Sequence, residues 1–124
     1  IKIDSVSSMD TRISANSGDV SLGDVVTDNV DLKTSSGNIT SGSIKAKRIN
    51  GRASSGDVMI RDCDAFEINI MTNSGDVSIG IGSEMKYEYT TKTSSGDVNV
   101  PDSVKGADGK CNIETSSGDI DVTQ

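Results

Sequence analysis

The sequence TSSGDV at residues 93–98 contains an SSGD core whose near-copies recur along the whole chain. The glycines of successive copies are separated by 19, 19, 19, 21 and 22 residues. A period of this length indicates a protein built from stacked repeats. The glycines are Gly18, Gly37, Gly56, Gly75, Gly96 and Gly118.

Between these glycines, apolar and polar residues alternate, and the alternation forms columns when the repeats are aligned. Alternation is typical of strands with one buried face, and the abundance of Val, Ile, Thr, Ser and Gly disfavours helices. The sequence predicts an all-β, single-domain parallel β-solenoid over residues 1–124, right-handed, with about six rungs of 19–22 residues. One inward column is expected to contain Val20, Ile39, Val58, Val77 and Val98.

The SSGD repeat is interpreted as the corner at which each rung bends from one face to the next. Glycine adopts positive φ without a Cβ clash, and the flanking Ser, Asn and Asp can bond to nearby backbone amides. A phosphate-binding loop is the poorer interpretation, because such a loop occurs once, between a strand and a helix.

Calcium binding is the remaining alternative for the corner, because the residue after the glycine is acidic in all but one copy. One carboxylate per rung is few for an ion that takes six to eight oxygens, so no metal and no cofactor are predicted. The acidic column, interrupted by Asn38, consists of Asp19, Asp57, Asp76, Asp97 and Asp119.

The composition excludes several classes of function. The net charge is −7, which disfavours nucleic acid as a partner, and no apolar stretch is long enough for a membrane helix. The chain has no His, and its many serines have no base at a recurring distance, so we expect no enzyme activity. Cys63 and Cys111 are predicted to be buried free thiols.

The outward columns are rich in charged residues, often of opposite sign on adjacent rungs, and are interpreted as a solvated face. One column contains Lys33, Arg52, Met71, Lys92 and Glu114. Another contains Arg48, Glu67, Glu88 and Lys110. Opposite charges on adjacent rungs are therefore expected to lie close together.

The repeated SSGD[VI] corners with alternating aliphatic residues resemble the bacterial putative-adhesin family of domains of unknown function, also called toastrack-type β-helix domains. The resemblance covers essentially the whole chain. It implies display outside the cytoplasmic membrane or at the cell surface, in some members with a link to envelope stress. The family has no agreed catalytic residues to transfer.

Three residues are weak candidates for a binding patch. Phe66 and Tyr87 each lie nine residues before a corner glycine, and we expect them on consecutive rungs beside Lys47. The segments 81–86 and 101–110 break the repeat period and are the places where a solenoid can add function.

The sequence therefore predicts a non-enzymatic, surface-exposed interaction or adhesin-like module. The alternative is an extracytoplasmic ligand-binding or envelope-sensing domain, with carbohydrate as one ligand class, and a polysaccharide-active enzyme is the third interpretation. The expected partner is a protein or a cell-surface glycan. We expect a fragment of a longer protein, with end-to-end self-association possible through the unpaired strand edges at the two ends.

Overall fold

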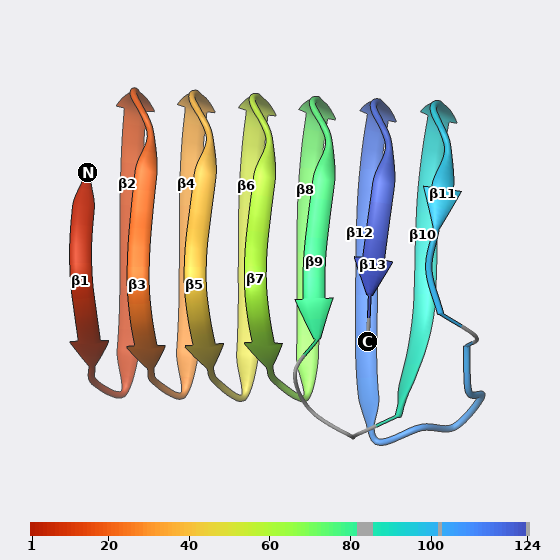
Figure 1. The fold of residues 1–124 in the computed structure, drawn as a ribbon, viewed down its shortest axis with the longest axis horizontal. Helices are drawn as coiled ribbons and strands as arrows, with labels where there is room; N and C mark the ends of the chain where they lie inside the picture. Colours follow the sequence, from red (N-terminus) through yellow and green to blue (C-terminus); the bar gives the residue numbers. More distant parts are fainter. Residues whose placement is uncertain (82–85, 102, 124) are drawn as a thin grey trace.

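Two parallel sheets lie face to face and are joined by tight turns in the computed structural model, which describes residues 1–81, 86–101 and 103–123 (Figure 1). The predicted irregular segments 81–86 and 101–110 lie partly outside this range. The strands are β1 (Lys2–Ser7), β2 (Asp10–Ser17), β3 (Val20–Val26), β4 (Asn29–Ser36), β5 (Ile39–Lys45), β6 (Arg48–Ser55), β7 (Val58–Asp64), β8 (Glu67–Ser74), β9 (Val77–Ile81), β10 (Tyr87–Ser95), β11 (Val98–Asn99), β12 (Gly109–Ser117) and β13 (Ile120–Thr123).

Each rung consists of one strand of the six-stranded sheet, a glycine corner and one strand of the seven-stranded sheet. We call the seven-stranded sheet, which starts at β1, sheet A, and the six-stranded sheet, which starts at β2, sheet B. Every pairing within the two sheets is parallel. The all-β parallel solenoid of about six turns is therefore confirmed, with two strands in each turn.

The rungs do not stack in chain order at the C-terminal end. Sheet A runs β1-β3-β5-β7-β9-β13-β11, and sheet B ends with β8, β12 and β10. The last rung of the sequence, β12–β13, is thus inserted between β8–β9 and β10–β11 (Figure 1). We call residues 109–123 the inserted rung.

This order corrects the predicted inward column. Ile120 pairs with Val77, and Val98 pairs with Ile120 at the end of the stack. Val98 is 42% exposed, whereas Val20, Ile39, Val58 and Val77 are buried. The residue spacing placed Val98 in the correct column but at the wrong height, because spacing within a repeat contains no information about which rungs are neighbours.

Outward charges supply one reason for the inserted order. Lys110 on β12 pairs with Glu67 on β8 and with Glu88 on β10. In chain order β10 would lie next to β8, and Glu88 would stand directly beside Glu67. Like charges at directly paired positions are destabilising, and the intervening lysine removes that repulsion.

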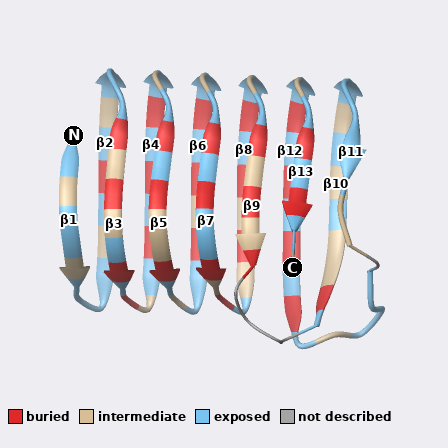
Figure 2. Cartoon of the chain, in the orientation of Figure 1, coloured by how far each residue is buried: buried red, intermediate tan, exposed pale blue. Residues whose placement is uncertain are grey.

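Burial of apolar side chains supplies a second reason for the inserted order of the rungs. The inserted rung turns Cys111, Ile113, Ile120 and Val122 into the core, and all four are buried. The terminal strand β10 carries Tyr89, Thr91 and Thr93 at the paired inward positions, and these side chains are only partly buried (Figure 2). The last rung of a solenoid packs against a neighbouring rung on one side alone, so the rung with polar inward residues is the more stable one there.

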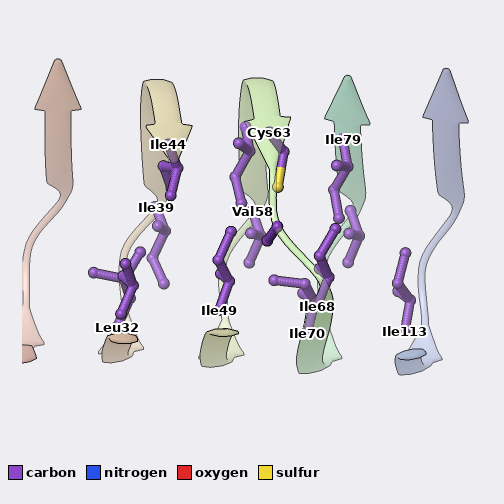
Figure 3. Packing of buried hydrophobic residues seen from close by; sticks show 14 of the residues in the cluster. Leu32, Ile39, Ile44, Ile49, Val58, Cys63, Ile68, Ile70, Ile79 and Ile113 are labelled. Atoms are coloured by element: carbon purple, nitrogen blue, oxygen red, sulfur yellow. The ribbon is translucent and has the colours of Figure 1, made fainter. Parts of the chain in front are cut away.

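The interior consists of aliphatic ladders between the sheets (Figure 3). Each fully buried Val, Leu or Ile contributes roughly 1.5–3 kcal/mol. Gly51 interrupts one ladder, and the Cδ1 atom of Ile70 on the next rung extends over it. Ser41 interrupts another, with a buried hydroxyl that has no hydrogen-bond partner in the described part of the chain.

The corner glycines have positive φ, between +132° and +159°, as the turn chemistry predicts. A second constraint arises from stacking: a Cβ on Gly56 would overlap the carbonyl oxygen of Gly37 on the adjacent rung. Gly18, on the first full rung, also has a positive φ, but a Cβ added there would meet no described atom within 4 Å.

We expect Gly56→Ala to destabilise the protein by more than Gly18→Ala does. Both changes strain a positive φ, at about 1–3 kcal/mol, but only the Gly56 change also forces two backbones apart. Chemical denaturation of the two variants measures the difference in unfolding free energy. Equal losses would show that φ alone selects glycine at the corner.

Candidate functional site

The aspartates of the corner form a hydrogen-bonded ladder along the stack. The backbone N–H of Asp57 donates to Oδ1 of Asn38 at 2.9 Å, and Oδ1 of Asp57 accepts from the N–H of Asp76 at 2.9 Å. The same bond recurs at every step from Asp19 to Asp97. Asn38 fits this ladder because an amide oxygen accepts the same bond as a carboxylate oxygen.

This geometry assigns the acidic column to backbone support. Each side chain from Asp19 to Asp119 in the stack supplies an oxygen to the turn of the next rung. Among the residues that the structure describes, no group of three or more Asp, Glu, Cys or His is placed to hold a metal ion.

The outer face of sheet B is hollowed into a shallow groove of about 640 Å³, which we call the outer groove. It crosses β4, β6, β8, β12 and β10. Its outward lining residues form two columns: Asp31, Asn50, Asn69, Asn112 and Thr90 in one, and Lys33, Arg52, Met71, Glu114 and Lys92 in the other.

Three asparagines form an amide ladder in the floor of the outer groove. The Nδ2 of Asn112 donates to Oδ1 of Asn69 at 3.0 Å, and the Nδ2 of Asn69 donates to Oδ1 of Asn50 at 3.3 Å. Nδ2 of Asn69 also lies 3.1 Å from Oε1 of Glu67. Each amide has two donor hydrogens and an oxygen with two lone pairs, so the ladder retains capacity to bond a ligand.

A second hollow, of about 520 Å³, shares Asp31 and Asn50 with the outer groove and extends toward β2. Two ion pairs lie beside it: Arg12 Nε to Asp31 Oδ2 at 3.7 Å, and Arg48 Nε to Glu67 Oε2 at 3.3 Å. Both join adjacent rungs, as the alternating charges predict. All four side chains are substantially exposed, so each pair contributes only about 0–1 kcal/mol to stability.

Sequence reasoning interpreted these columns as solvent-facing and did not single out a groove. The available signal was the shared column of Asn50, Asn69 and Asn112. In chain order Thr90 separates Asn69 from Asn112, and only the inserted position of β12 makes the amide ladder continuous.

Comparison with known families decides the classification, because one family model matches residues 1–124 under the description Toastrack DUF4097. The chain belongs to the Toastrack DUF4097 family. The name denotes a domain of unknown function, so membership identifies the type of domain but assigns no activity. Searches of curated proteins and of solved structures matched nothing. No helix in the described part of this toastrack domain is long and apolar enough to cross a membrane.

The toastrack domain does not bring its predicted aromatic pair together. Tyr87 is 1% exposed, and its hydroxyl donates to the carbonyl oxygen of Ala65 at 2.6 Å. Gly109 of the inserted rung occupies the register position between Tyr87 and Phe66, so the two aromatics are not on consecutive rungs. Phe66 is 56% exposed, and Lys47 is exposed on the neighbouring rung.

Tyr87 therefore has a structural position: its ring lies against Tyr89, with centroids 6.0 Å apart, at the end of the core. Phe66 and Lys47 remain predicted binding residues, without the aromatic partner that motivated the choice.

Both cysteines of the toastrack domain are buried free thiols, as predicted. Burial raises the pKa of Cys63 from 9.0 to about 12, with a smaller contribution from Cys111. Burial likewise raises the pKa of Cys111 to about 12. Removing the proton would leave a charge in an apolar interior.

We expect Asp57→Ala to lower the unfolding free energy by about 1–2 kcal/mol, because the N–H of Asp76 loses its acceptor. Asp57→Asn should be nearly neutral, since Asn38 makes the same bond in the native ladder. Thermal and urea unfolding measure both effects. A calcium-dependent rise in melting temperature that Asp57→Asn abolishes would contradict this assignment.

We expect the unfolding free energy to fall as the pH rises from about 9 to about 12. The thiols ionise more readily in the unfolded chain than in the fold, so their contribution is complete below pH 9 and is lost as the pH approaches 12. Cys63→Ala should reduce the slope of unfolding free energy against pH by up to about 1.4 kcal/mol per pH unit. A slope unchanged in both Cys63→Ala and Cys111→Ala would contradict the account; Tyr89, whose pKa is also raised to about 12, supplies the remainder.

Proposed function

We propose that this domain is a non-enzymatic, adhesin-like interaction module that binds a glycan chain along the outer groove of sheet B. The observation that carries the proposal is the amide ladder of Asn50, Asn69 and Asn112 in the floor of an elongated, solvent-open groove. Neutral amides that both donate and accept suit sugar hydroxyls, which also do both.

The groove has the shape that a linear polymer requires. It crosses successive rungs that are about 4.8 Å apart and continues into the neighbouring hollow near β2. The same chemical groups therefore recur along its length. A ligand with a regular repeat could make equivalent contacts with several rungs, and the individual contacts would add through one molecule.

Charge in the groove differs from charge on the protein as a whole. The chain has a net charge of −7, yet the lining of the groove holds Lys33, Arg52 and Lys92 against two carboxylates, Asp31 and Glu114. An acidic or neutral glycan is therefore favoured over a cationic one. Met71, 45% exposed in the same groove, offers an apolar surface to the face of a sugar ring.

The non-enzymatic part of the proposal rests on the residues available. The chain contains no His, and of the three carboxylates at or beside the groove, Asp31 and Glu67 pair with arginines, while Glu114 lies next to Lys92 in register. Display outside the cytoplasmic membrane is part of the same proposal and is what the family resemblance implies. Such a location would bring the groove into contact with cell-surface polysaccharides.

A glycan array followed by calorimetry tests the proposal. We expect a saturable ligand with no release of product, and at least a tenfold loss of affinity in Arg52→Ala, which corresponds to about 1.4 kcal/mol. Arg61→Ala is the matched control, because Arg61 is an exposed arginine on sheet A. Equal losses in the two variants, or no saturable ligand, would contradict the proposal, and cleavage of any polysaccharide would overturn the non-enzymatic assignment.

A further inference from the structure

The inserted rung contacts strands that all precede it in the sequence. β12 pairs with β8 on one side and β10 on the other, and β13 pairs with β9 and β11. Only residues 100–108 connect it to these neighbours (Figure 1). Strands β8–β11 together therefore form a slot one rung wide, which the last part of the chain fills.

The walls of this slot are specific for the sequence of the inserted rung. Glu67 and Glu88 flank the position of Lys110 on either side. The Oδ1 of Asn69 accepts from Asn112 at 3.0 Å. An acid in place of Lys110 would stand between two glutamates, and an apolar residue in place of Asn112 would lose the bond to Asn69.

The corner of the slot is equally selective. Oδ1 of Asp76 accepts from the N–H of Asp119 at 2.9 Å, and Oδ1 of Asp119 accepts from the N–H of Asp97 at 2.8 Å. A Cβ on Gly118 would overlap the carbonyl oxygen of Gly75. The occupant must therefore carry a Gly-Asp corner in register with its outward lysine and asparagine.

We propose that the inserted rung is exchangeable, and that in a dimer residues 109–123 of a second copy fill the slot of each protomer. A second copy offers the same sequence in the same register, so every contact of the slot is reproduced. Residues 100–108 take a new path and give up hydrogen bonds to β10, such as Val104 N–H to the carbonyl oxygen of Tyr87 at 3.0 Å, and they can span up to about 30 Å when extended. Exchange of an identical element of this kind is a recognised route to dimers.

Exchange requires the inserted rung to leave the core first. Its departure exposes Cys111, Ile113, Ile120 and Val122, all of which are buried. Opening is therefore slow under native conditions, and mild denaturant should accelerate it. High protein concentration should then favour refilling the slot from a second copy.

Cysteine cross-linking between two single variants tests the exchange. Met71 on β8 and Glu114 on β12 are exposed register partners, at a parallel spacing of about 4.8 Å that suits a disulfide. Copies carrying Met71→Cys are mixed with copies carrying Glu114→Cys, incubated at high concentration in mild urea, returned to buffer and oxidised. We expect a disulfide-linked dimer of one copy of each variant.

The matched control mixes Met71→Cys with Arg52→Cys. Arg52 is also an outward register partner of Met71, but both lie outside the inserted rung, so exchange cannot join them. The double variant Met71→Cys/Glu114→Cys should form the bond within one chain, and light scattering should then find it monomeric after the same treatment.

Two results would overturn the proposal. The first is a Met71→Cys and Glu114→Cys mixture that cross-links no more than the control mixture, although the double variant closes its internal disulfide. The second is a double variant that does not close this bond, which would contradict the position of β12 beside β8. Neither result depends on glycan binding, so this test is independent of the proposed function.

Discussion

The close approach of backbones at the glycine corner is the constraint on which the rest of this structure depends. The carbonyl oxygen of one corner glycine lies where the Cβ of the next would have to be. Rungs can therefore stack only with glycine above glycine, and this condition sets the register of every other column. The aspartate ladder and the threonine hydroxyls that donate to corner carbonyls, such as Thr72 to Gly56 at 3.3 Å, strengthen the same alignment.

The register of the rungs then determines which outward side chains are neighbours on the surface. Once the corners are aligned, outward side chains at equal distances from the glycine must lie about 4.8 Å apart on adjacent rungs. That spacing is short enough for one asparagine to bond the next and for arginine to meet a carboxylate. The outer groove is therefore a consequence of repetition: a single Asn would be an ordinary surface residue, and three in register form a continuous polar track.

The position of the last rung shows how burial and charge select among arrangements that share one repeat. Both C-terminal rungs carry the SSGD corner, so both satisfy the glycine constraint equally well. Ile113 is buried in the inserted rung, whereas Thr91 at the paired position of β10 is only partly buried at the end of the stack. Lys110 between Glu67 and Glu88 favours the same order. The more stable order of the rungs therefore differs from their order in the chain, and residues 100–108 connect β11 to the inserted rung.

The sequence by itself determined the fold class, the period, the corner glycines, the free thiols and which residues face inward, because all of these depend on short-range chemistry repeated in every copy. Only the tertiary structure decided which rungs are neighbours, since alignment of equivalent repeats gives every order the same columns. The burial of Tyr87 away from Phe66, the exposure of Val98 and the continuous amide ladder all follow from that order. They arise from contacts between residues far apart in the chain, where the free energies of burial and of charge pairing select one stack.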